Sequence, residues 1–164
     1  MLALTFSSLK DATSHLFAQT TFDCFDVLEA SISSYINFSM DGHLNTSFFD
    51  NSSESEKCQS RFCSWKKLRP VCFSIIKGKQ PPISFQISLF LDINNIRTVF
   101  PEADITANPD IEGFIIRFSY KNKLLSLSTG TVFFNFSMDR DSEHCWDMTI
   151  RKWISNIGLS FDEP

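Results

Sequence analysis

The sequence predicts an α+β domain in which an antiparallel sheet carries its helices on one face. From Ile83 to Leu91 the residue pattern has a period of two, which is typical of a strand with one buried face. Near the end of the chain, Trp146, Ile150 and Trp153 fall on one side of an amphipathic helix. The chain has 164 residues, which is enough for one domain or for two small halves of one.

The second half of the chain gives the clearer order of elements. Asp92 is suited to cap a short helix that Pro101 ends, because aspartate accepts hydrogen bonds from free amides at a helix start. Acidic residues at 139–143 favour a helix start, and Gly158 is suited to stop that helix. Between these helices we expect strands at 113–120, 124–128 and 131–138, with tight turns at 121–123 and 129–130.

The first half repeats this order more loosely. A short helix is predicted around residues 9–16, and residues 25–40 hold strands without an obvious turn. A second helix is predicted to carry Cys58, Phe62, Trp65 and Leu68 on one side and to end at Pro70.

One pentapeptide occurs twice, as Asn37–Asp41 and as Asn135–Asp139. Both copies follow β-rich residues and precede a helix that contains tryptophan, so we interpret them as corresponding positions in two pseudo-symmetric halves. The first half then spans 1–70, with a long polar loop at 42–55. A linker at 71–82 leads to the second half at 83–160, and the two halves form one domain overall.

Charge is distributed unevenly along the chain, although its formal net value is only −4. Residues 57–79 hold seven basic residues and no acidic one, whereas 1–56 carry a net charge of −7 and 80–164 one of −4. This pattern indicates a local contact surface for an acidic protein partner, with a solvated helix face as the alternative. The predicted partner-binding residues are Lys57, Arg61, Lys66, Lys67 and Arg69.

The motifs favour a protein without enzymatic activity, cofactor or metal. No histidine accompanies a serine or cysteine motif, and there is no glycine-rich phosphate loop. Cys58 and Cys63 with His43 or His144 are conceivable zinc ligands, but the short Cys-x-x-Cys spacing of convincing sites is missing. The sequence shows no membrane-spanning run and no export signal, which predicts an intracellular protein that is not secreted and binds no membrane.

Three segments of the second half carry distinctive patterns: residues 86–92 in the first strand, the acidic, proline-containing residues 108–117, and the apolar residues 124–130 that end in glycine. They resemble the first-strand motif, the acidic-proline segment and the glycine-ended turn of the TATA-box-binding protein family. Gly113, Arg117 and Gly130 are the firmest points of this resemblance, which covers 83–159. It implies a saddle whose concave sheet binds the DNA minor groove, and a convex basic helix that recruits transcription factors.

The resemblance also assigns residue roles. Gln86 stands where the family has a DNA-contacting asparagine, and Ile111 and Leu127 replace phenylalanines that wedge between bases. The implied DNA-binding residues are Gln86, Ile111, Arg117, Leu127, Phe133 and Asn135. The implied function is transcription initiation, in a nucleus or at a site of viral transcription. The implied partner is DNA, with AT-rich DNA as the candidate, which the protein alone binds weakly. The alternative is an architectural protein-interaction subunit that keeps the fold and no longer binds DNA.

Overall fold

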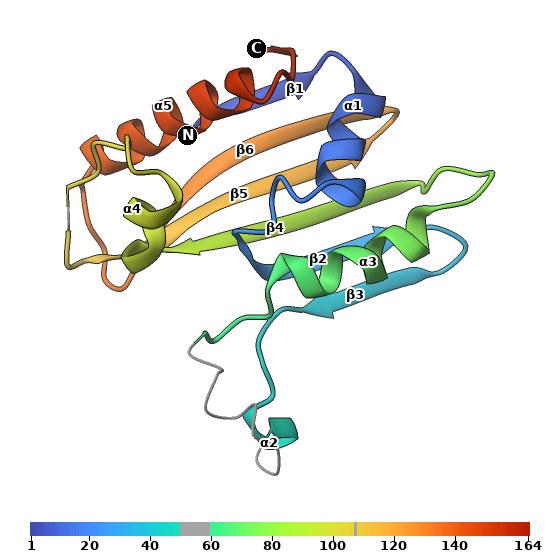
Figure 1. Cartoon of the computed structure of the whole chain (residues 1–164), viewed down its shortest axis with the longest axis horizontal. Coiled ribbons are helices and arrows are strands. Elements are labelled where there is room, and N and C mark those ends of the chain that lie inside the picture. The colour runs from blue at the N-terminus through green and yellow to red at the C-terminus, as the bar shows by residue number, and fades with distance from the viewer. Residues whose placement is uncertain (50–59, 107) are drawn as a thin grey trace.

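The computed structural model describes residues 1–49, 60–106 and 108–164, and these form an α+β fold around one antiparallel sheet (Figure 1). The sheet has seven strands in the order β3-β2-β4-β5-β6-β1-β7. The strands are β1 (Ala3–Phe6), β2 (Asp26–Ser33), β3 (Asn37–Asp41), β4 (Ser84–Asp92), β5 (Ile111–Lys121), β6 (Leu124–Phe133) and β7 (Phe161–Asp162). The helices are α1 (Leu9–Thr13), η1 (Ser14–Ala18), α2 (Thr46–Phe49), α3 (Trp65–Ile76), η2 (Ile93–Asn95), α4 (Ile96–Val99) and α5 (Asp141–Asn156).

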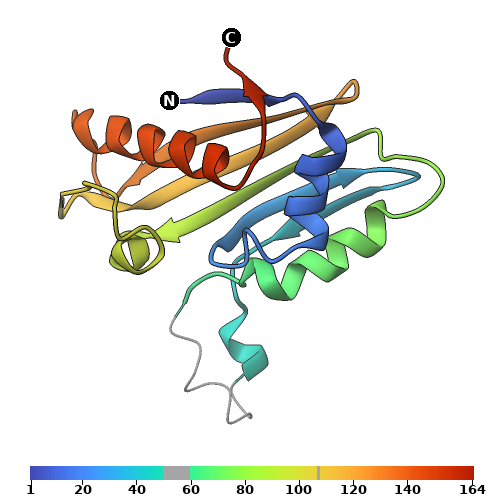
Figure 2. The same cartoon turned by 45° about the horizontal axis from the view of Figure 1, so that its top comes forward.

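The helices α1, α3, α4 and α5 cover the same face of the sheet, as two views of the ribbon show (Figures 1 and 2). Alternate strand residues point into the layer between sheet and helices, because successive side chains of a strand face opposite sides. Fully buried Trp65 and Trp146 come from the helices, and they meet Phe114 and Phe118 of β5 in one apolar core. The class predicted from the sequence is therefore correct.

The elements expected at 83–121 and 139–158 are confirmed, with small changes in their bounds. Asp92 accepts a hydrogen bond from the amide of Asn94 at 2.8 Å, which is the expected cap. Asn122 and Lys123 both have positive φ, 53° and 64°, as a tight turn between β5 and β6 requires. Gly158 has φ 87° just beyond α5, a conformation that glycine adopts readily at a helix end.

The turn predicted at 129–130 is wrong, because β6 is one unbroken strand. Thr129 and Gly130 pair with Ile116 and Ile115 of β5 in continuous register. The Thr129 hydroxyl accepts from the amide of Leu2 at 2.8 Å and bonds to Asp147, so this residue is held in the sheet from two sides. Gly130 instead leaves room for the side chain of Ile115, since a Cβ there would lie 2.9 Å from Cγ1 of Ile115.

Two expectations for the first half, the bounds of its second helix and the linker, are also corrected. The helix predicted to end at Pro70 begins at Trp65 and continues to Ile76, so the proposed linker is helical from 71 to 76. Pro70 lies inside α3, where a proline removes one hydrogen bond and crowds the preceding turn, and the buried Trp65 and Cys72 anchor the helix on either side of it. Residues 3–6 form a strand that was not predicted, and Cys58 lies outside the described residues.

The two copies of the pentapeptide have different structures. Asn37–Asp41 is the edge strand β3, whereas residues 135–139 lie in the loop between β6 and α5. The pairing of the first strands also differs, because β4 lies between β2 and β5 while β1 lies outside β6. A strand–helix–strand–strand–helix order occurs twice along the chain, but this sheet does not establish a saddle or a two-fold symmetry.

Candidate functional site

The face of the sheet opposite the helices, here called the open face, carries mainly small polar side chains. Their positions follow from the register, since residues directly opposite each other on neighbouring strands share a face. We call a row of such paired residues across the sheet a rung. One rung crosses all seven strands, and a second crosses every strand except β7. The first rung is Ser39, Ser31, Gln86, Ser119, Ser126, Thr5 and Asp162, and the second is Asp41, Glu29, Ser88, Arg117, Ser128 and Ala3.

The open face is hollowed on the side of β2 and β3. A hollow of about 520 Å³ includes Glu29, Asp41 and His43 in its lining, and a neighbouring one of about 360 Å³ reaches Lys121. Ser31, Ser39 and Gln86 line both hollows. Hydroxyl, amide and carboxylate groups in this lining suit hydrogen bonding to a polar surface, and apolar side chains such as Met40 and Phe38 lie among them.

A polar cluster at the centre of the open face joins three strands. The Arg117 Nε donates to the hydroxyl of Ser88 at 3.0 Å, and that hydroxyl donates to a Glu29 carboxylate oxygen at 3.4 Å. The Arg117 guanidinium also lies 4.0 Å from Glu29, and both side chains remain accessible, 41% and 57% respectively. Arg117 and Glu29 therefore compensate each other's charge while staying available to a partner.

A small aromatic cap closes one end of the open face. The ring of Phe62 lies 5.2 Å from that of Phe90, and Arg61 pairs with Glu112 above them. Gly113 lets the Phe90 ring pack against the backbone, because a Cβ on Gly113 would come within 2.6 Å of this ring. Beside this cap, burial raises the pKa of Asp26, and a hydrogen bond from the Ser60 hydroxyl at 2.8 Å partly opposes the shift.

At the edge of the sheet, Asp41 and His43 form an exposed pair with 2.5 Å between Oδ1 and Nδ1. The backbone amide of His43 also donates to this carboxylate at 3.0 Å. These two hydrogen bonds lower the pKa of Asp41. No nucleophilic side chain among the described residues is hydrogen-bonded to this pair. Its geometry is therefore that of an ion pair at the edge of the sheet.

The structure brings together only two of the residues implied to bind DNA. Gln86 and Arg117 lie on the open face, in adjacent rungs. The placement of Ile111 and Leu127 there is wrong, since they are 1% and 0% exposed in the core. Phe133 packs against the same core, and Asn135 is exposed in the loop after β6.

These residues were assigned to the wrong face of the sheet because the assumed alternation was shifted by one residue. Along β6, Leu125 and Leu127 face the helices while Ser126 and Ser128 face outward, as the alternation of the sequence itself indicates. Ile111 turns inward because the register shifts between Ile111 and Gly113, which leaves Glu112 as the extra residue of a bulge. The alternation of serine and leucine along β6 identifies the open face by itself, without the family resemblance.

Two of the predicted partner-binding residues, Arg61 and Arg69, are already engaged in ion pairs within the chain. Arg69 forms an ion pair with Asp23 at 2.8 Å in which both side chains are largely buried, and Arg61 pairs with Glu112. Lys66 and Lys67 are exposed on α3. Lys57 lies outside the described residues.

Within the described ranges, no group of three His, Cys, Asp or Glu side chains is placed to hold a metal ion. Burial raises the pKa of the Cys72 thiol to about 12, which makes this thiol a poor nucleophile. A search of the same residues finds no helix with the length and apolarity to cross a membrane.

Together these features define a class of protein: an α+β domain with one helix-covered face and one polar open face. Residues 15–162 match a protein family described as a family of unknown function, DUF5721, and the chain belongs to this family. Comparisons with curated proteins and with solved structures gave no match.

Proposed function

We propose that the protein is a non-enzymatic interaction module that binds a protein partner through its open face. The observation that carries this proposal is the polar rung running from Ser39 to Asp162 across the whole sheet. No helix among the described residues covers it (Figure 2). Small hydroxyl side chains leave the strand surface accessible, so a partner with complementary polar groups can approach closely.

The charges of the open face favour protein over DNA. Glu29, Asp41 and Asp162 lie on the two long rungs, and Arg117 is the basic residue there. Phosphate contacts by Lys and Arg supply most of the non-specific affinity for DNA. Arg117 is paired with Glu29, and Lys121 adds one more basic side chain, so carboxylates still outnumber basic groups on the open face and it repels phosphates more than it attracts them.

A relation to the TATA-box-binding protein family is a further part of this proposal. The strand–helix–strand–strand–helix order, which occurs twice along the chain, supports this relation. The different pairing of β1 and β4 weighs against a symmetric saddle. A shared ancestry of that kind is compatible with the loss of DNA binding, because function resides in the site rather than in the fold.

Photo-crosslinking in the cells that express the protein tests the proposal. A benzophenone amino acid placed at Ser31 or Ser39, both exposed on the open face, should crosslink to the same protein. The matched control is the same amino acid at Ser155, which is exposed on the helix side. An Arg117→Glu change should abolish the crosslinks from Ser31 and Ser39, because it places two carboxylates side by side at the centre of the face.

A second measurement addresses DNA directly. We expect no change in the fluorescence anisotropy of a labelled AT-rich duplex at low salt when folded protein is added. Salt-dependent binding that Arg117→Ala weakens would overturn the proposal in favour of DNA recognition. Equal crosslinking from Ser31 and Ser155 would also overturn it, since the open face would then not be the binding surface.

A further inference from the structure

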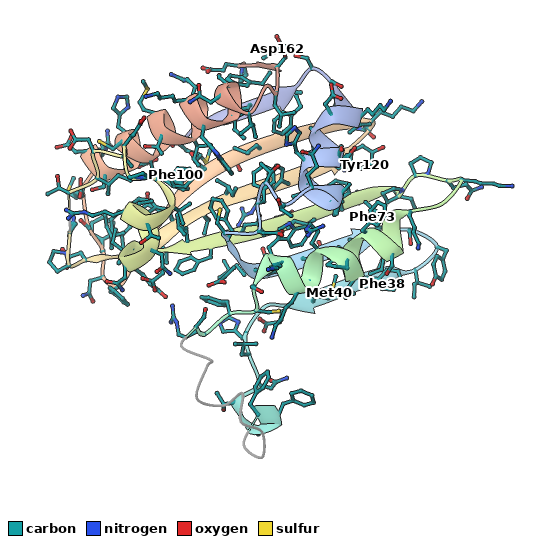
Figure 3. The ribbon with its side chains drawn as sticks, viewed as in Figure 1. Phe38, Met40, Phe73, Phe100, Tyr120 and Asp162 are labelled. Carbon is teal, nitrogen blue, oxygen red and sulfur yellow. The ribbon has the colours of Figure 1, made fainter. Side chains whose placement is uncertain are left out.

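A second surface, on the helix side of the sheet, combines an apolar floor with a basic rim. A groove of about 620 Å³ lies between α1 and the C-terminal end of α3, and residues 77–82 close one side of it. We call it the lysine-rimmed groove. Phe73 of α3 and Tyr120 of β5 both line it (Figure 3).

The floor of the groove is strongly apolar. Leu9, Phe73, Ile76, Pro81 and Tyr120 contribute side chains from four separate segments. Phe73 is 41% exposed although it is a large aromatic residue on a regular helix. Exposed aromatic side chains beside a concave apolar surface are typical of sites that anchor a ligand.

The rim of the groove is positively charged. Lys10 comes from α1 on one wall, and Lys77 and Lys79 come from the loop on the other. No aspartate or glutamate is among the lining residues. Within the described part of the chain, none of these lysines forms an ion pair, so each ammonium group is available to a ligand.

The loop that carries two of the lysines has a conformation set by its glycine. Gly78 has φ 146°, a value that residues with a side chain rarely adopt, and Lys77 and Lys79 flank it. No heavy atom lies within 4 Å of the position a Cβ would take on Gly78. The loop is therefore open to solvent at its tip, while its lysines line the groove.

We propose that the lysine-rimmed groove binds a peptide segment of a protein partner that has a bulky apolar anchor flanked by acidic residues. The anchor fills the floor between Leu9 and Phe73, and carboxylates on either side pair with lysines on opposite walls. A fatty acid fits less well, because its single carboxylate can pair with the lysines of only one wall. The proposal does not depend on the open face, which lies on the other side of the sheet.

Selection from a random peptide display library with the whole chain as bait tests this proposal. Enriched peptides should carry acidic residues around an aromatic or aliphatic anchor, and their binding should weaken with salt. A fluorescein-labelled copy of the most enriched peptide then serves as the probe in anisotropy titrations. In the double variant Lys77→Glu, Lys79→Glu we expect its Kd to rise about tenfold or more, because a favourable charge pair becomes repulsive.

The matched control is the double variant Lys66→Glu, Lys67→Glu. It makes the same change of net charge at the opposite, N-terminal end of α3, and its residues do not line the groove. Its Kd should change by less than about twofold. Phe73→Ser, at a position exposed enough to tolerate the change, should lower the affinity for the peptide without loss of the helical circular dichroism signal.

Several outcomes overturn the proposal: no enrichment, enrichment of non-acidic peptides, or equal weakening by the two double variants. Binding of a fluorescent fatty acid that the selected peptide fails to displace would overturn it as well. Arg117→Ala should leave peptide affinity unchanged. Failure of the peptide test and failure of the crosslinking test are therefore distinguishable, since they use variants on opposite sides of the sheet.

Discussion

The two faces of the central sheet consist of alternate residues of the same strands, and they differ in almost every property. On the helix side of β6, Leu125 and Leu127 are buried beneath the helices, while Ser126 and Ser128 between them face outward. The helix side holds the fold together by burial of apolar surface. The open face contributes little of that burial, so its residues are free to serve recognition. Four experiments test this division, from the largest expected effect to the smallest.

Neighbouring residues of β6 give the largest contrast. Leu127→Ala should lower the free energy of unfolding by about 2–5 kcal/mol, because it leaves a cavity in the core. Ser128→Ala should change it by less than about 0.5 kcal/mol, as is usual for surface positions. Urea denaturation measures both. A large loss for Ser128→Ala would mean that the open face is structural after all.

Removing an ion pair on the helix side should also cost more stability than removing one on the open face. Arg69 and Asp23, on the helix side, are 16% and 12% exposed and lie 2.8 Å apart. Arg69→Ala should cost about 1.5–3 kcal/mol, because hydrogen bonds to a charged group are lost in a partly buried site. Arg117→Ala should cost less than about 1 kcal/mol, since its pair with Glu29 is long and accessible. Equal losses in thermal unfolding would contradict this ranking.

Two glycines of the open face sharpen the comparison within one surface. A Cβ on Gly113 would lie 2.5 Å from the carbonyl oxygen of Leu91, which is fixed in the sheet. Gly113→Ala should therefore cost about 1–3 kcal/mol. Gly130→Ala meets only the flexible side chain of Ile115, so its cost should be smaller. Denaturant midpoints of the two variants provide the measurement, and the reverse order would show that Ile115 cannot move.

The smallest effect concerns pH. Burial raises the pKa of Asp26 above its unfolded value, so its ionised form destabilises the fold at neutral pH. Asp26→Asn should raise Tm at pH 7, and this gain should disappear as the pH falls below the unfolded value of 3.8. Asp41→Asn is the control with the opposite sign, because hydrogen bonds from His43 lower the pKa of Asp41. It should lower Tm at pH 7 and have no effect in acid. Tm shifts of the same sign would refute the assignment.

Local patterns predicted much of the fold. The alternation at β4, the Asp92 cap and the helix that ends before Gly158 depend on neighbours in sequence, and all are present. Residues 3–6 were missed because their strand forms by pairing with β6 and β7, which no local pattern reveals. Pro70 was interpreted as a helix end, but packing around Trp65 and Cys72 carries α3 past it.

The candidate site was predicted in part. Gln86 and Arg117 were placed on the correct face because they alternate with buried residues of clear apolar character. Ile111 was misplaced because a bulge reverses the facing of strand residues, and a bulge has no reliable signature in a single sequence. Leu127 was assigned by the register of the resemblance, although the alternation of β6 indicated the core.

The position of β1 constrains how this chain is completed on the ribosome. Ala3 pairs with Ser128, and Thr5 with both Ser126 and Asp162, so β1 finds its partners only after the long intervening segment has been synthesised. Such distant pairings are slow to form, because a long loop must close first. We therefore expect β1 to stay unpaired on nascent chains until β6 has been synthesised. During that interval chaperones have a defined strand to protect.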